Sequence, residues 1–216
     1  MVINPTMAGA QGQKLYPVPS GFTILNYIET NGSSSRLQLH FGASSLHKLT
    51  AVFELLTVKE APLFGARTSA TANRDVLWCP GLINGEPNIV YQSGTNNVYT
   101  GTSGVTFSTG VKYTVIAENG KITFNGTTYT GTAGTTFGAA TYPVCSLFNL
   151  NQGTGQQTQF WHGKLYSLKI EVKGEYTGVN CILGDFVPVM RISDSAYGLW
   201  DKVTAWFNTH ASLTGG

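Results

Sequence analysis

The strongest constraint on the fold lies in the middle of the chain, where residues 111–118 alternate apolar and polar side chains and then reach Asn119-Gly120. Alternation of this kind is typical of a half-buried strand, and Asn-Gly favours a two-residue type I′ hairpin turn. Residues 121–124 return as a second strand, and Asn125-Gly126 leads into a third at 127–130. We therefore predict an antiparallel meander of three strands.

Strand-like runs recur along the rest of the chain between Gly, Ser and Asn turns, and no fixed-period repeat is present. The strands are expected at 22–28, 36–41, 63–67, 76–78, 89–92, 144–150, 160–173 and 182–190. Residues 48–58 could form a helix, but their β-branched and aromatic side chains favour a buried strand. This pattern predicts an all-β sandwich of two antiparallel sheets packed face to face.

The domain organisation follows from length and from proline content. A chain of 216 residues can bury one sizeable core. Residues 1–20 contain Pro5, Pro17 and Pro19 and show no sustained period. We predict a short extended N-terminal arm at 1–20, followed by a single sandwich domain at 21–216.

The charge pattern removes several classes of partner. Only 11% of the residues are charged, against about 25% in an ordinary soluble domain. The net charge is +2 without a Lys/Arg stripe, so nucleic acid is not an expected partner. No apolar run is long enough to span a membrane, and the start of the chain does not resemble a secretion signal.

The three cysteines, Cys79, Cys145 and Cys181, lie far apart in the sequence. Their odd number and wide spacing define neither a metal knuckle nor a complete disulfide framework. We expect buried free thiols, as suits folding in a reducing cytoplasm, while one disulfide with a spare thiol stays open.

Several segments, taken in order, resemble the laminin-G-like, concanavalin A-like jelly-roll domains of phage structural proteins and gut-bacterial surface proteins. The matching segments are Ser20–Thr30, Leu63-Phe-Gly-Ala-Arg67, Tyr113-Thr-Val with Ile122-Thr-Phe-Asn-Gly126, 163–170, 185–191, 198–203 and 206–208. The resemblance covers about residues 20–209 and implies a jelly-roll sandwich. It implies little about function, because this sandwich is used for sugar binding, adhesion, capsid decoration and catalysis.

The sequence offers no catalytic constellation. Glycoside hydrolases of the concanavalin A-like class need two carboxylates at the scissile bond, commonly on a Glu-x-Asp-x-x-Glu strand, and this motif is absent from the sequence. The closest acids, Glu171 and Glu175, bracket a Lys-Gly turn. No Gly-x-Ser-x-Gly motif exists, and the histidines lack a recognisable Ser or Cys partner: His40, His47, His162 and His210. A non-enzymatic protein is expected.

No metal site is expected from the spacing of His and Cys residues. Calcium stays open as a cofactor, because laminin-G domains hold it with a loop carboxylate and backbone carbonyls. Asp75, in Asn73-Arg-Asp75, is the acid whose position resembles that loop. The alternative is an ordinary surface turn formed by Arg74 and Asp75.

Uncharged glycans are bound by aromatic faces together with amide groups, and two groups of residues supply both. The first combines Trp78 with Tyr91, Gln92, Asn96, Asn97 and Tyr99, and the second is the charge-free segment 149–162 with Asn149, Asn151, Gln157, Trp161 and His162. The alternative for both groups is a role in the sandwich core. Trp200 and Trp206 lie in the closing segments and are expected in the core.

The leading functional hypothesis is a virion structural or accessory protein of a tailed phage: a capsid decoration protein, a head fibre or a tail-associated adhesin. It would assemble in the host cytoplasm, dock through its arm on a major capsid or tail protein, and display a lectin-like jelly roll toward surface polysaccharide. The alternative is a carbohydrate-binding or adhesion module at a bacterial cell surface. Self-association stays open, although no heptad or collagen-like repeat is present to drive it.

Overall fold

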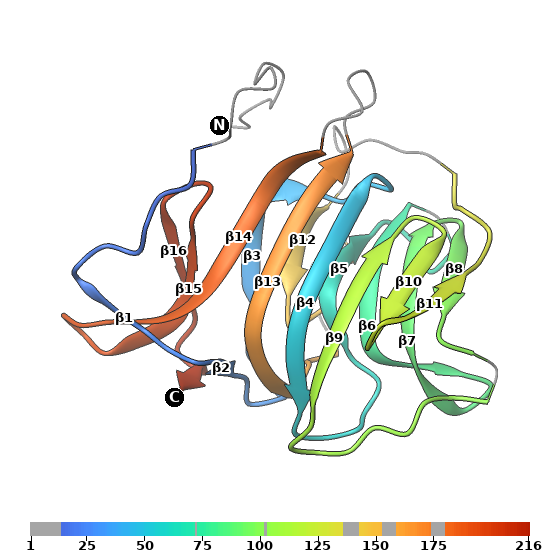
Figure 1. Cartoon of the computed structure of the whole chain (residues 1–216), viewed down its shortest axis with the longest axis horizontal. Coiled ribbons are helices and arrows are strands. Elements are labelled where there is room, and N and C mark those ends of the chain that lie inside the picture. Colours follow the sequence, from blue (N-terminus) through green and yellow to red (C-terminus); the bar gives the residue numbers. More distant parts are fainter. Residues whose placement is uncertain (1–13, 72, 102, 136–142, 153–158, 174–179) are drawn as a thin grey trace.

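The computed structural model describes residues 14–71, 73–101, 103–135, 143–152, 159–173 and 180–216. Every regular element in these ranges is a strand, and the paired strands run antiparallel in two sheets that face each other (Figure 1). The described part of the chain contains no helix that could cross a membrane. The predicted all-β sandwich is confirmed.

The smaller sheet has six strands in the order β3-β12-β5-β6-β7-β8 and lies behind the larger sheet in Figure 1. Its centre is the long pair β6 and β7, joined by a tight turn. The strands are β3 (Leu37–Gly42), β12 (Val144–Leu147), β5 (Pro62–Arg67), β6 (Arg74–Ile83), β7 (Glu86–Gly94) and β8 (Asn96–Tyr99).

The larger sheet has the order β11-β10-β9-β4-β13-β14-β15-β16, with three short strands paired beside this path. Its main strands are β11 (Thr127–Thr130), β10 (Lys121–Phe124), β9 (Lys112–Glu118), β4 (His47–Leu55), β13 (Gly163–Lys173), β14 (Asn180–Arg191), β15 (Ala196–Asp201) and β16 (Trp206–Thr209). The short ones are β1 (Phe22–Ile24), β2 (Ile28–Glu29) and β17 (Thr214–Gly215).

Strand β14 changes partners along its length and so shapes one end of the sandwich. Its first half pairs with β13, and its second half pairs with β1 and β15 (Figure 1). The β15–β16 hairpin is thereby carried away from β13 until β16 contacts β3 of the other sheet. This contact places β16 at the edge of the smaller sheet, where the larger recess described below is formed.

The period-2 patterns of the sequence match the observed burial. In β9, Tyr113, Val115 and Ala117 are buried, whereas Lys112 and Thr114 face solvent, as alternating side chains in a half-buried strand must. The ambiguous run at 48–58 is a strand, β4, and its inward residues enter the core between the sheets. The preference for a strand over a helix is therefore confirmed.

The three-stranded meander is present, but its type I′ turn lies at the second Asn-Gly rather than the first. Both Asn125 (φ 46°) and Gly126 (φ 85°) are left-handed, whereas at the first turn only Gly120 is. The side-chain amide of Asn119 binds the backbone of Gly134 outside the turn. It accepts a hydrogen bond from the Gly134 N–H (2.6 Å) and donates one to the Gly134 carbonyl (3.2 Å). The expected turn type at Asn119-Gly120 is wrong for that reason.

The described end of the predicted arm, residues 14–20, contains no strand and lies against β15. The Tyr16 N–H donates to the Lys202 carbonyl (2.6 Å), and the Trp200 indole donates to the Tyr16 carbonyl (3.4 Å). Residues 1–13 lie outside the described ranges. The division into arm and sandwich domain stays a prediction.

All three cysteines are free, as expected, but the expected burial is wrong for one of them. Cys79 and Cys145 are fully buried, whereas Cys181 in β14 is partly exposed. Burial raises the pKa of the Cys79 and Cys145 thiols well above the ordinary value, and the nearby Asp75 raises that of Cys145 further. Both groups therefore stay protonated and unreactive near neutral pH.

Alkylation should distinguish the three thiols. Iodoacetamide at pH 8 should label Cys181 in the native protein, and Cys79 and Cys145 only after unfolding in urea, because the reactive thiolate is both inaccessible and disfavoured at the buried positions. Peptide mass spectrometry after timed labelling measures this order. Native labelling of Cys145 as fast as Cys181, or a disulfide in the unreduced protein, would contradict it.

Candidate functional site

Trp161, expected as a sugar-stacking residue, lies in the core between the sheets and is 1% exposed. Its ring stacks on Phe148 at 5.8 Å and meets the edge of Phe53 at 6.1 Å. The indole N–H donates to the Cys79 carbonyl at 2.7 Å. Neither face of the ring reaches solvent, so this burial contradicts the expected stacking role, and the alternative core role of Trp161 is the observed one.

Other residues of the two predicted groups are also turned away from solvent. Asn149 and Tyr91 are fully buried, which removes both from any open binding surface. His162 is half-buried, with Nδ1 3.4 Å from the Thr57 hydroxyl. Gln157 lies outside the described residues.

The segment after β12 crosses the outer face of the smaller sheet. Asn151 forms a bridge to Ala66 of β5, and Leu150 packs in a cluster with Val76 and Trp78 of β6. Asn151 then lines a recess beside β3 and β16, whereas Gln159, further along the segment, lines a second recess over β6 and β7. The same outer face thus carries two separate recesses.

The first recess, the Trp206 groove, has a volume of about 650 Å³ and lies between β16 and the β3–β12 edge. Trp206 stands at this groove with 66% of its surface exposed, and it alternates with Phe207, whose ring packs on Phe22 at 5.0 Å. The groove is lined by Arg36, Leu37, Gln38, Pro143, Ser146, Asn151, Trp206, Phe207, Asn208, Thr209 and His210.

The structure corrects one of the two tryptophans expected in the core. Trp200 is buried, as expected, but Trp206 is not. Successive side chains of a strand point to opposite faces, and β16 pairs only with β15 among the described strands. Because Phe207 packs against Phe22, Trp206 lies on the opposite face of β16, where it is exposed at the groove.

The second recess, the Trp78 pocket, measures about 260 Å³ and brings together three residues of the first predicted group. Trp78, Gln92 and Asn97 meet there because β6, β7 and β8 are adjacent, with Gln92 opposite Asn97. Tyr99 packs with the neighbouring apolar cluster, and the Asn96 amide donates to the Ala133 carbonyl instead. The pocket is lined by Glu60, Arg67, Trp78, Gly81, Leu82, Ile83, Val90, Gln92, Asn97 and Gln159.

Two arginines add positive charge near this pocket. Arg67 lies opposite Arg74 across the β5–β6 pair, and burial lowers the pKa of both guanidinium groups. The charge of Arg67 lowers the pKa of Arg74 further, whereas Glu60 acts in the opposite direction on Arg67. Neither Arg67 nor Arg74 forms an ion pair with any carboxylate of the described residues.

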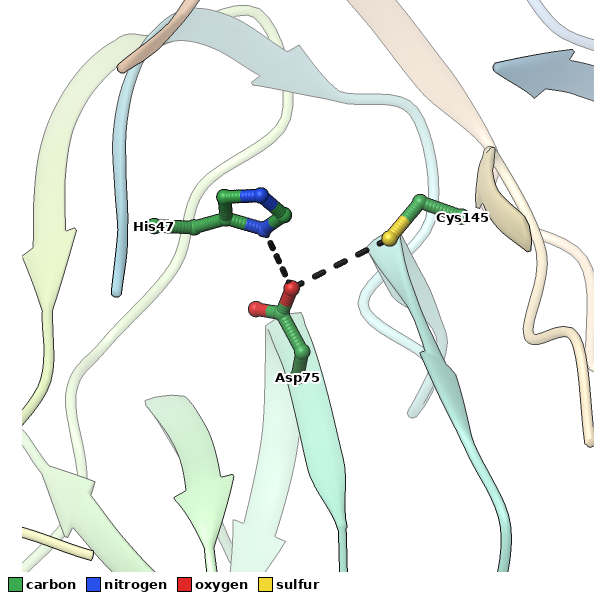
Figure 2. A group of neighbouring side chains, drawn as sticks. All are labelled: His47, Asp75 and Cys145. Carbon is green, nitrogen blue, oxygen red and sulfur yellow. Dashed lines mark hydrogen bonds and ion pairs between the residues drawn. The ribbon is translucent and has the colours of Figure 1, made fainter. Parts of the chain in front are cut away.

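A different cluster lies in the core, where Asp75 of β6 is completely buried against His47 of β4 (Figure 2). Asp75 Oδ2 lies 2.5 Å from His47 Nδ1, 3.0 Å from the Ser44 N–H and 3.8 Å from Cys145 Sγ. Its Oδ1 accepts a hydrogen bond from the Tyr91 hydroxyl at 2.9 Å. This contact and burial raise the pKa of Tyr91 well above its ordinary value, burial being the larger cause.

The donor set around Asp75 argues for a structural role. His47, Asp75 and Cys145 have ligand atoms within 4.8 Å of one another, but both Asp75 oxygens are already surrounded by donors. Calcium requires six to eight oxygen ligands, so this geometry opposes the expected calcium position, and the alternative of a surface turn is wrong because Asp75 is buried. The Cys145 thiol faces Asp75, and burial together with this carboxylate raises the pKa of the thiol, so the contact does not activate it as a nucleophile.

Sequence reasoning missed several residues of the two recesses. Arg67 and Glu60 belong to neither predicted group, because only the pairing of β5 with β6 brings Arg67 and the residues before β5 beside Trp78. A signal for Trp206 did exist, since Trp206 and Asn208 alternate with Phe207 near the end of the chain. Such alternation is typical of an edge strand with one solvent-exposed face, which would leave Trp206 exposed, but it is equally compatible with a core strand.

Comparison with protein-family models gives no match, and neither does comparison with curated proteins. Among solved structures, a native heptameric SAP-like pentraxin from Limulus polyphemus is similar with a TM-score of 0.39 and 9% sequence identity. The alignment covers 84% of this chain and 95% of the pentraxin chain. The function must therefore be inferred from the recesses themselves.

The buried carboxylate provides a stability test. Asp75→Asn should lower the free energy of unfolding by about 3–5 kcal/mol, the usual cost of removing one partner of a buried pair. An asparagine cannot accept from His47, Ser44 and Tyr91 together. Urea denaturation measures the loss.

Asp194→Asn is the matched control for that experiment, because it removes a carboxylate whose partner, Arg191, lies at the surface. Little change is expected there. Equal stability of both variants would refute the structural role of Asp75.

Proposed function

We propose that this protein is a non-enzymatic carbohydrate-binding sandwich whose binding site is the Trp206 groove. The observation that carries the proposal is Trp206 itself, 66% exposed beside a groove of about 650 Å³. Large aromatic rings are seldom left open to water without a partner surface, and an indole face suits the C–H face of a sugar ring.

The polar lining of the groove supports the same ligand class. Gln38 and Asn208 present amides that can both donate and accept, as neutral hydroxyl groups require. The Asn151 amide lies at the same surface and donates to the Val144 carbonyl at 2.7 Å, which fixes its orientation. Volumes of about 300–1,000 Å³ are usual for small-molecule sites, so the groove can hold a short oligosaccharide.

Binding without cleavage fits the distribution of carboxylates. Among the described residues that line the Trp206 groove there is no Asp or Glu, and the Trp78 pocket contains only Glu60. Hydrolysis of a glycosidic bond by the usual mechanism needs two carboxyl groups facing one another across the substrate. The groove therefore has hydrogen-bonding and stacking groups without the acid and base.

The proposed setting of this sandwich is a phage virion, as a capsid decoration protein, head fibre or tail-associated adhesin assembled in the host cytoplasm. The matching segments, which follow the same order along the chain as in phage jelly-roll domains, support this setting. The three free thiols also support it, because free cysteines suit assembly in a reducing cytoplasm. Many copies on one particle would convert weak sugar contacts into avidity. A carbohydrate-binding module at a bacterial cell surface is the alternative.

Removal of the exposed indole tests the binding site. Trp206→Ala should weaken binding of the best ligand from a glycan array at least about tenfold, which corresponds to about 1.4 kcal/mol, with an unchanged unfolding midpoint because the ring is mostly solvent-exposed. Isothermal titration calorimetry measures the affinity. Ile24→Ala removes another exposed apolar side chain, on β1, that does not line the groove, and should bind like the wild type; equal affinity of all three proteins would exclude this site.

The virion setting has its own test. Quantitative mass spectrometry of purified particles should detect this chain in a fixed copy number relative to the major capsid protein. Its absence from particles, together with its recovery from bacterial surface fractions, would favour the alternative setting while leaving the binding site unaffected.

A further inference from the structure

We infer that the Trp78 pocket is a second subsite that binds the carboxylate of an acidic sugar, such as a uronic acid. The inference rests on the proposed function in one respect only, that the outer face of the smaller sheet binds glycans. It concerns a different recess and a different chemical group from those of the Trp206 groove.

The first argument is a concentration of buried polar atoms that have no partner. Six such side-chain atoms occur among the described residues, and three of them belong to residues that line this one pocket: Arg67 Nε, Trp78 Nε1 and Gln92 Oε1. Buried polar groups are hydrogen-bonded in about 90% of cases or more, and leaving one unpaired costs about 1–3 kcal/mol. Three in a single recess point to a partner from outside the chain.

The second argument is charge. Arg74 is bound by the backbone carbonyls of Ala70, Gly94 and Thr95, none of which neutralises it. Arg67, opposite Arg74, has no ion pair within the described residues, and Glu60 is the single carboxylate that lines the pocket. Arg74 does not line the pocket itself, but it adds a second guanidinium group beside Arg67. The two positive charges face one carboxylate, which favours an anion as occupant.

The third argument is the arrangement of donors and acceptors. Arg67 Nε–H and Trp78 Nε1–H can only donate, and a carboxylate can only accept. Gln92 Oε1 can only accept, so the same ligand must also carry a donor, which a sugar hydroxyl supplies. A ligand with a carboxylate and neighbouring hydroxyl groups satisfies all three atoms at once, whereas a bare carboxylate leaves Gln92 unpaired.

The size and rigidity of the pocket fit one sugar ring. Its volume of about 260 Å³ is just below the range of about 300–1,000 Å³ that holds drug-sized ligands. Trp78 is 5% exposed and fixed by Val90 and Leu150. Gly81 packs tightly against both side chains, because a Cβ there would lie 2.8 Å from Val90 Cγ2 and 2.9 Å from Trp78 Cβ.

The test is an NMR titration of the full chain with glucuronic acid, glucose and acetate, followed through the Trp78 indole N–H signal. Glucuronic acid should shift this signal and bind at least tenfold more tightly than either glucose or acetate. Equal binding of glucuronic acid and glucose would overturn the role of the carboxylate. Equal binding of glucuronic acid and acetate would overturn the assignment of a sugar.

Two variants locate the effect. Arg67→Gln removes the positive donor and should lower the affinity for glucuronic acid at least tenfold. Gln92→Glu keeps the size of the side chain but adds a negative charge that repels the ligand carboxylate. It should lower the affinity for glucuronic acid by an equal or larger factor. If one variant fails to fold, as judged by thermal melting, the other still decides the proposal.

The matched control is Lys121→Gln, which removes a positive charge on β10 of the larger sheet, outside the lining of both recesses, and it should leave glucuronic acid binding unchanged. Unchanged affinity in a folded Arg67→Gln or Gln92→Glu variant would overturn the inference. Trp206→Ala tests the other recess. If glucuronic acid does not bind the Trp78 pocket but Trp206→Ala still abolishes glycan binding, the proposed function stands and only this inference is wrong.

Discussion

The sandwich depends on the compensation of one buried charge. The Asp75 carboxylate on the smaller sheet is shielded from water and meets His47 from the larger sheet, with Tyr91, Ser44 and Cys145 completing its surroundings. Carboxylate oxygens accept and do not donate, so the imidazole must carry its proton on Nδ1 to face Asp75. A buried carboxylate is tolerable only when such donors reach it, which fixes the two sheets at one position relative to each other.

The core between the sheets is closely packed, and the two recesses described above lie on the outer surface. Trp161 is an example: its indole fills the space between Phe53 and Phe148, and its N–H satisfies the Cys79 carbonyl. The outer face of the smaller sheet is different. There the crossing segment at Leu150 covers only the middle of the sheet, and the open parts on each side hold the Trp206 groove and the Trp78 pocket.

The candidate site was partly predictable for a physical reason. Trp78, Gln92 and Asn97 lie on neighbouring strands with the same facing direction, so their alternation in the sequence contained enough information to group them. Arg67 and Glu60 could not be grouped with them, because the approach of β5 to β6 is a long-range pairing. Trp161 was expected at a binding surface and is buried, whereas Trp206 was expected in the core and is exposed. Composition alone does not show which rings are buried, because burial depends on the neighbours that pack on both faces of each ring.

The sequence by itself determined the all-β class, the meander of β9 to β11 and the strand rather than helix at β4. Each of these follows from local alternation or turn residues. Only the tertiary structure decided which aromatic faces reach solvent, where Asp75 lies and which polar atoms converge. Those properties depend on strand order, on the bend of β14 and on which face of an edge strand is covered. No local pattern in the sequence encodes them, because they arise from contacts between segments far apart in the chain.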